Sequence, residues 1–204
     1  MFYNNPMKIA YKLLNAAEEV FMDHGLVHAT VDEICLKAKV SKPTFYKLYK
    51  DKDDLFVGYA QFKGARVIED IEQFAGKILD LDSFISQSEA YLKYMSAQDV
   101  QIFSSFVAAR ALFDPRILEV RKTFLNKKFQ ARQRIVTQLI IAGLIAPTRN
   151  IAEITKLLGS LISLDPLFCA TCCEQDELLE ANYRSFAEER CKIFIKVANE
   201  FYAS

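Results

Sequence analysis

The side chains with the clearest chemical potential are lysines gathered in one short stretch. Six lysines lie between residues 37 and 52 against one acid, Asp51, although the 204-residue chain balances 26 basic against 26 acidic residues. Such a cluster can neutralise the phosphates of a nucleic acid, with an affinity that falls steeply as salt rises. The alternative is a solvated basic face on an ordinary helical protein. The charge pattern therefore indicates a local capacity to bind polyanions, and not a general one.

This stretch is predicted to form two short helices joined by a tight turn. Thr30 and Glu33 have the spacing of a capping box at the start of the first helix, and Ser41 is the expected N-cap of the second. In the second helix the apolar side chains fall on one face and the basic and polar ones on the other. One face can pack on the neighbouring helix while the other enters a DNA groove. The residues predicted to meet base edges in the major groove are Lys42, Pro43, Thr44 and Lys47.

The residues around the two helices follow a longer pattern, AAEEVFMDHGLVHATVDEICLKAKVSKPTFYKLYKDKDDLF. The segment from Lys8 to Tyr59 that contains it resembles the DNA-binding domain of the TetR family of transcriptional regulators, over about a quarter of the chain. The family usually has Gly where this chain has Lys39, and a lysine there costs about 1 kcal/mol if the turn needs a positive φ. The resemblance implies phosphate contacts from Thr30, Ser41, Tyr46, Tyr49 and Lys52.

The rest of the chain shows helical periodicity with capping signals and no strand alternation. Asp114-Pro115 predicts a helix start, with the aspartate as N-cap and the proline in the first turn. A fourth helix is expected from residue 51 or 52 to about residue 78, and a fifth is expected to be capped by Asp82 or Ser83. We predict an all-α fold of about nine helices.

Two domains are predicted. Residues 1–52 would form a three-helix helix-turn-helix domain, and residues 53–204 a helical bundle for effector binding and dimerisation. The TetR resemblance implies a homodimer whose last two helices form the interface; the alternative is a monomer that buries them. The expected interface residues are Leu157, Leu161, Tyr183, Phe186, Phe194 and Val197.

Many aromatic side chains lie in the second domain. They either fill a core or enclose an effector. Arg110 lies in the apolar stretch IFSSFVAARALF, where a buried charge requires an acidic neighbour or a polar or anionic ligand. The candidates for the effector pocket are Tyr59, Phe62, Tyr91, Tyr94, Phe103, Phe106, Arg110, Phe113 and Phe124.

Three of the five cysteines lie close together, at Cys169, Cys172 and Cys173. Thiolates at this spacing could share a soft metal ion or respond to oxidation, or they could pack as small hydrophobic side chains. No histidine lies near them, so no metal site and no cofactor are assigned. No phosphate loop, HExxH or GxSxG motif nominates catalytic residues, and an enzyme is not expected.

These patterns predict a DNA-binding transcriptional regulator, a repressor released from a palindromic operator by a small-molecule effector. The alternatives are a metal- or redox-responsive regulator acting through the cysteine cluster, and a helical enzyme or carrier. The expected partners are an operator in double-stranded DNA, a small-molecule effector and a second copy of the chain. The apolar runs are too short for a membrane helix and no signal peptide is evident, so a cytoplasmic protein is expected.

Overall fold

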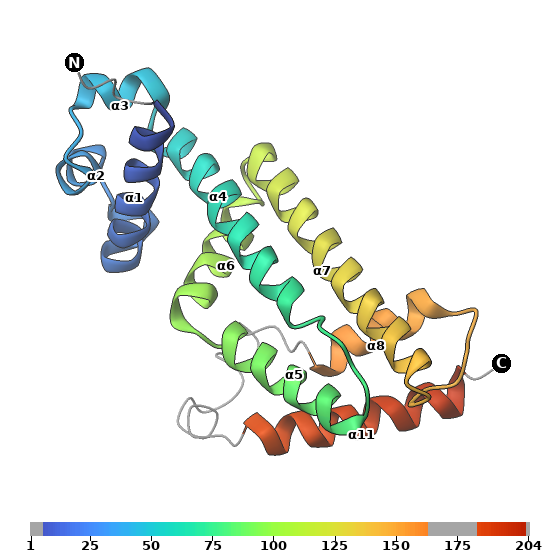
Figure 1. Ribbon diagram of the computed structural model, residues 1–204. Coiled ribbons are helices and arrows are strands. Elements are labelled where there is room, and N and C mark those ends of the chain that lie inside the picture. Colours follow the sequence, from blue (N-terminus) through green and yellow to red (C-terminus); the bar gives the residue numbers. More distant parts are fainter. Residues whose placement is uncertain (1–5, 163–182, 203–204) are drawn as a thin grey trace. The chain divides into compact units, whose positions relative to one another are not determined.

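The computed structural model describes residues 6–162 and 183–202, and over these ranges it contains helices and no strand (Figure 1). The predicted all-α fold of about nine helices is confirmed, since nine are present in the described ranges. They are α1 (Pro6–His28), α2 (Val31–Ala38), α3 (Lys42–Leu48), α4 (Lys52–Gln73), α5 (Leu81–Met95), α6 (Gln98–Arg110), α7 (Pro115–Ile141), α8 (Ile151–Ile162) and α11 (Tyr183–Phe201).

The helices form two compact units. Unit 1 comprises Met1–Arg66 and Ile102–Arg121, and unit 2 comprises Val67–Gln101 and Lys122–Ser204. The division falls within α4, α6 and α7 and not between residues 52 and 53, because three short helices bury too little surface to form a core alone. The first part of α4 therefore belongs with the helix-turn-helix. The assignment of residues 1–52 and 53–204 to separate functions stays a prediction.

Unit 1 is built around a cluster of aromatic rings. The Phe21 ring packs edge-on against Phe56 and Tyr59, with ring centroids 5.7 and 5.5 Å apart. Tyr59 in turn meets Phe103 of α6 at 5.8 Å. All four rings are buried. These contacts hold α1 and the first part of α4 together. Both α2 and α3 pack against α1, so the cluster also supports the helix-turn-helix.

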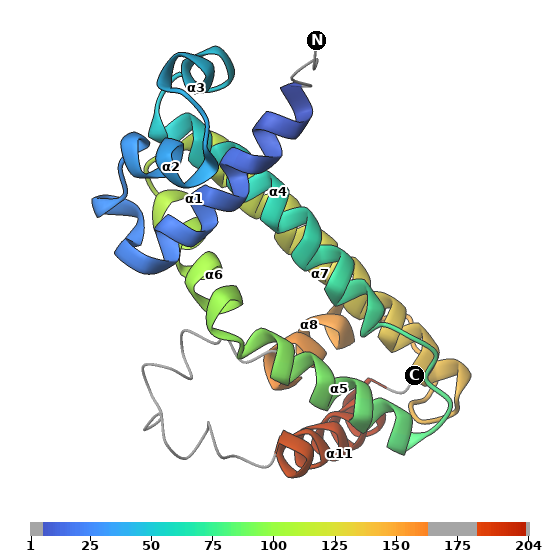
Figure 2. The same cartoon turned by 60° about the vertical axis from the view of Figure 1, so that its left-hand side comes forward.

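Unit 2 has its own core, in which α5 and α11 lie side by side (Figures 1 and 2). Phe84 of α5 packs against Phe194 of α11 with a centroid distance of 6.1 Å, and both are fully buried. Leu139 of α7 and Ile154 of α8 complete the same cluster. This core fixes the helices that surround the pocket described below.

The connection between α4 and α5 is held by side chains from other helices. Gln138 of α7 accepts a hydrogen bond from the Ile78 amide at 2.7 Å and donates one to the Ala75 carbonyl at 3.1 Å. Gln87 of α5 donates to the Lys77 carbonyl at 3.0 Å. Backbone groups that α4 would otherwise have paired are satisfied in this way, and α4 ends at Gln73, before the expected residue 78.

None of the helices within the described ranges combines the length and the apolar character needed to cross a membrane.

Candidate nucleic-acid interface and effector pocket

The first helix of the helix-turn-helix begins at a complete capping box. The Glu33 amide donates to Thr30 Oγ1 at 3.2 Å, and the Thr30 amide donates to Glu33 Oε2 at 3.0 Å. The Thr30 hydroxyl also donates to the same carboxylate oxygen at 2.8 Å. These bonds to the ionised form lower the pKa of Glu33. The Thr30 hydroxyl, predicted to contact phosphate, is thus already oriented by the cap.

The turn between α2 and α3 is a left-handed one formed by a lysine. Lys39 has φ 54° and ψ 45°, the one non-glycine residue with positive φ in the described chain. Its amide donates to the Leu36 carbonyl at 3.1 Å and the Val40 amide donates to the Cys35 carbonyl at 3.0 Å. This is a Schellman motif, which favours glycine at the left-handed position. Residue 39 therefore has the positive φ at which a lysine was expected to be costly.

The second helix, α3, has one buried and one exposed face. Ser41 caps it, with its hydroxyl 2.8 Å from Thr44 Oγ1 and accepting from the Thr44 amide at 3.4 Å. Phe45 is fully buried, whereas the Tyr46 side chain is 55% exposed. Lys42, Pro43 and Lys47 are exposed as well, and Thr44 is half-buried. The structure therefore groups the side chains predicted to read bases on the outer surface of this helix.

Three of the six lysines have ionic or hydrogen-bonding partners within unit 1. Lys42 lies 2.7 Å from Asp32 of α2. Lys37 pairs with Glu19 at 3.0 Å and with Asp23 at 3.2 Å, both on α1. Lys47, by contrast, makes no ion pair or side-chain hydrogen bond with any described residue and stands free on α3.

Lys52 has a structural role that its sequence position does not reveal. Its ammonium donates to the carbonyl oxygens of Leu26 at 2.9 Å, Val27 at 3.1 Å and Ala29 at 2.8 Å. An ammonium has three protons to donate, and all three are used here to satisfy the end of α1. The predicted phosphate contact from Lys52 would require this arrangement to break.

Tyr49, another predicted phosphate contact, lies at the C-terminal end of α3 and is half-buried. Its ring packs against Phe45 with centroids 5.8 Å apart. Burial raises the pKa of its hydroxyl. Gly58 of α4 leaves room for this ring, since a β-carbon there would lie 3.1 Å from Tyr49 Cε1. Tyr49 therefore joins α3 to α4, and any phosphate contact would come from its hydroxyl end.

Comparison with known proteins agrees with this geometry. Residues 13–59 match the family described as bacterial regulatory proteins, tetR family. The part of the chain that forms α1 to α4 is thus similar to the tetR family. The transcriptional activator FasR from Mycolicibacterium smegmatis is 37% identical over 62 residues, which make up 30% of this chain and 28% of FasR. The similarity to FasR is thus limited to less than a third of that relative's length.

Two solved structures are similar over nearly the whole chain. A putative TetR-family regulator from Mesorhizobium loti aligns with a TM-score of 0.81 and 18% identity, covering 95% of this chain and 98% of its own. FadR from Bacillus subtilis, solved in complex with stearoyl-CoA, aligns with a TM-score of 0.66 and 14% identity, covering 91% and 97%. At these identities the likeness establishes a shared fold.

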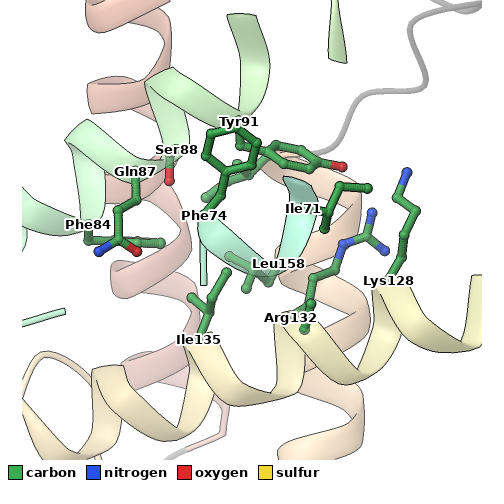
Figure 3. A pocket seen from close by; sticks show the side chains of 12 residues that line it. Ile71, Phe74, Phe84, Gln87, Ser88, Tyr91, Lys128, Arg132, Ile135 and Leu158 are labelled. Atoms are coloured by element: carbon green, nitrogen blue, oxygen red, sulfur yellow. The ribbon is translucent and has the colours of Figure 1, made fainter. Parts of the chain in front are cut away.

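Unit 2 contains a pocket between α4, α5, α7 and α8 (Figure 3). Its cavity volume is about 40 Å³, and its walls are mainly apolar. Of the nine residues predicted to enclose an effector, only Tyr91 is among those that line it. Sequence reasoning did not nominate Lys128 and Arg132, which line the pocket from α7.

The other predicted pocket residues lie elsewhere. Tyr59 and Phe103 are buried in the core of unit 1, and Phe113 is 83% exposed. Arg110 forms an ion pair with Asp53 at 2.6 Å, which is the acidic neighbour that was one of its two expected partners. The remaining members of the set pack against other side chains: Phe62 against Tyr11, Tyr94 against Phe74 and Asp70, and Phe124 under Lys128, while Phe106 is half-buried on α6.

The predicted interface residues are partly exposed, with one exception. Leu157 and Leu161 of α8 and Tyr183, Phe186 and Val197 of α11 are partly exposed. Phe194 is fully buried against Phe84. Phe194 therefore belongs to the core of its own subunit, and the structure gives no support to its predicted place at a dimer interface.

The cysteine cluster at Cys169, Cys172 and Cys173 lies outside the described residues. Within them, Cys35 and Cys191 are buried free thiols. Burial raises the pKa of Cys191 to about 11, which keeps this thiol protonated and unreactive. No group of three or more His, Cys, Asp or Glu side chains in the described part of the chain is arranged to hold a metal ion.

Proposed function

We propose that this chain is an operator-binding repressor that acts as a homodimer in the cytoplasm and is released from DNA by a small-molecule effector. The observation that carries the proposal is the outer face of α3. Its exposed Tyr46 and its Lys47, which has no partner in the described ranges, are held outward by the fully buried Phe45. A helix of this kind can lie in the major groove, where lysine suits guanine O6 and N7.

A dimer is proposed because one short recognition helix reads too few base pairs. A two-fold pair would place the two α3 helices roughly 34–36 Å apart, in successive major grooves of a palindromic site. The partly exposed apolar side chains of α8 and α11 are the proposed contact. They include Leu157 and Leu161 on α8 and Phe186 and Val197 on α11.

The pocket of unit 2 is the proposed effector site. Its mainly apolar walls carry a few polar and basic side chains, as the walls of small-molecule sites usually do, and FadR, which shares the fold, was solved with stearoyl-CoA. An effector changes DNA binding only through its different affinity for the two states of the protein. We assign no catalytic role to the chain. FasR is an activator, so transcription from a reporter is the measurement that decides the sign of regulation.

The recognition surface is tested with duplexes selected from random DNA by the unmodified protein. Replacing Tyr46 and Lys47 with alanine is expected to weaken retention of the selected duplex in a gel shift by a factor of roughly 100, because a base-reading contact contributes about 1–3 kcal/mol. Lys127→Ala, an exposed change on α7, is the control and should retain DNA like the parent. Equal retention by the double variant, with unchanged helicity and oligomeric state, would refute the assignment.

A further inference from the structure

Two basic side chains in the pocket have no acidic partner among the residues that the structure describes. Lys128 and Arg132 lie one turn apart on α7, so they share a face, and both line the cavity (Figure 3). Neither forms an ion pair with a described residue; the Lys128 ammonium lies 5.5 Å from the centre of the Phe124 ring. Arg134 on the same helix, by contrast, pairs with Glu72 at 3.2 Å. Partly buried cations without a counter-ion favour an anion beside them.

The remainder of the pocket is suited to an apolar body. Phe74, Phe84, Ile135, Leu158 and Ile162 contribute to its walls. In Figure 3 the side chains of Arg132 and Lys128 extend from α7 toward the side of the cavity where the Phe74 and Tyr91 rings lie. Away from the two cations is Gln87, whose Oε1 atom is buried and has no hydrogen-bond partner among the described residues. The two charges thus lie at one end of a mainly apolar space, and the other end carries the uncharged Gln87 amide.

A glycine on α8 makes room for the arginine. A β-carbon at Gly159 would lie 2.9 Å from Arg132 Nη1 and 3.2 Å from its Cζ. Such distances are shorter than a van der Waals contact, so the guanidinium can occupy its present position only because residue 159 has no side chain. Gly159 is therefore a positioning residue for Arg132.

We propose that this pocket binds an amphiphilic anion, with a carboxylate or phosphate head held by Arg132 and Lys128 and a single apolar chain or ring system against the opposite walls. The guanidinium of Arg132 would bind the head group through paired N–H donors, and Lys128 would contribute a second positive charge. The proposal rests on the function proposed above for unit 2 and specifies the chemical class of its effector.

Direct binding to the full chain tests the proposal. Titration calorimetry would compare decanoate, dodecanoate and dodecyl phosphate with the uncharged decanol and dodecanol. At least one anion should bind saturably and at least about tenfold more tightly than the alcohol of the same chain length, because hydrogen bonds to charged groups are stronger than those to neutral ones. Saturable binding that is equally tight for the alcohols, or no binding by any anion, would overturn it.

Variants locate the anion at the named side chains. The double change Arg132→Gln and Lys128→Gln should remove the preference for the anion and leave the affinity for the alcohol. Gly159→Ala, which raises helix propensity, should displace the guanidinium and weaken anion binding while the melting temperature stays the same or rises. Lys127→Gln, on the exposed side of α7, is the matched control. An unchanged preference in the double variant would overturn the assignment.

Binding measured in this way is independent of DNA. The Tyr46 and Lys47 alanine variant should bind the anion like the parent protein. If the unmodified protein binds the anion but selects no duplex from random DNA, only the proposed function is at fault. If it selects a duplex but binds none of the anions, only the inference is at fault.

Discussion

Asp32 Oδ1 of α2 lies 2.7 Å from Lys42 Nζ on the recognition helix. The hydrogen bond to Asp32 is the main reason that the pKa of Lys42 is raised. Both side chains are more than half exposed, and such surface pairs contribute little to folding stability. Their effect falls on DNA binding instead, because Lys42 must leave Asp32 to reach a base or phosphate, and the carboxylate itself repels the DNA.

Replacing Asp32 with asparagine should therefore strengthen DNA binding. We expect operator affinity to rise roughly three- to tenfold at moderate salt, with a steeper salt dependence, because one more cation is free to displace counterions. Fluorescence anisotropy over a salt series would measure both quantities. Glu69→Gln, which removes an equal charge from an exposed position on α4, should leave them nearly unchanged. A weaker complex for the asparagine variant would show that Asp32 helps to orient Lys42 for binding.

The left-handed turn at Lys39 should limit the stability of the protein. Lys39→Gly is expected to raise the free energy of unfolding by about 1 kcal/mol, since glycine adopts φ 54° without the steric penalty of a β-carbon. Lys39→Asn should give a smaller gain, and Lys39→Val a loss, because a β-branched residue tolerates this region least. Urea unfolding of the series would give the order. A less stable glycine variant would contradict the idea of a strained turn.

The hydrogen bonds of the Lys52 ammonium are expected to stabilise the folded protein. Lys52→Met leaves three carbonyl groups at the end of α1 without their donor, and we expect the free energy of unfolding to fall by about 1–3 kcal/mol. Lys50→Met, which alters an exposed neighbour, should change it by less than about 0.5 kcal/mol. If the methionine variant at 52 unfolds like the parent but loses operator affinity, Lys52 is a phosphate contact and not a structural residue.

Asp114, the residue before α7, is expected to contribute to the free energy of unfolding, and acid should remove this contribution. Hydrogen bonds from the side chain and amide of Arg116 lower the pKa of Asp114 below its ordinary value of 3.8. The folded protein then binds this proton less readily than the unfolded chain, so the contribution is complete well above pH 3.8 and is lost as the pH falls through the lowered pKa. Asp114→Asn should be less stable than the parent at neutral pH and approach it in acid.

Unfolding by urea at a series of pH values would reveal this convergence. Glu69→Gln again serves as the control, because Glu69 is exposed and has no ion-pair partner among the described residues. If the difference in free energy of unfolding between the parent and Asp114→Asn stays constant down to strongly acidic pH, the ionised carboxylate is not the source of that difference.

The features that could be predicted from sequence are those set by neighbours in the chain. The capping box of Thr30 and Glu33, the proline start of α7 after Asp114 and the outward face of α3 all depend on spacings of a few residues. Each is present in the structure. For the same reason the glycine usual in the family at position 39 correctly indicated a positive φ there.

Features that depend on distant partners could not be predicted. The N-cap of α5 is Asp80, with Ser83 as its reciprocal partner, and not Asp82 or Ser83 as expected. The shift follows from the early end of α4, which is fixed by Gln138, about 60 residues further along the chain. Lys128 and Arg132 resemble surface charges in the sequence, because nothing local indicates that α4, α5 and α8 surround them.

The two hydrogen bonds from Gln138 also make the segment after α4 an element of defined length. Phe74, the first residue of this segment, and Phe84, in the first turn of α5, both line the pocket, so the short stretch of chain between them sets the distance between the two rings. Lengthening or shortening it by a single residue would alter the bore of the cavity without changing any of its lining side chains. Related proteins that differ only in the length of this segment are therefore expected to bind ligands of different width.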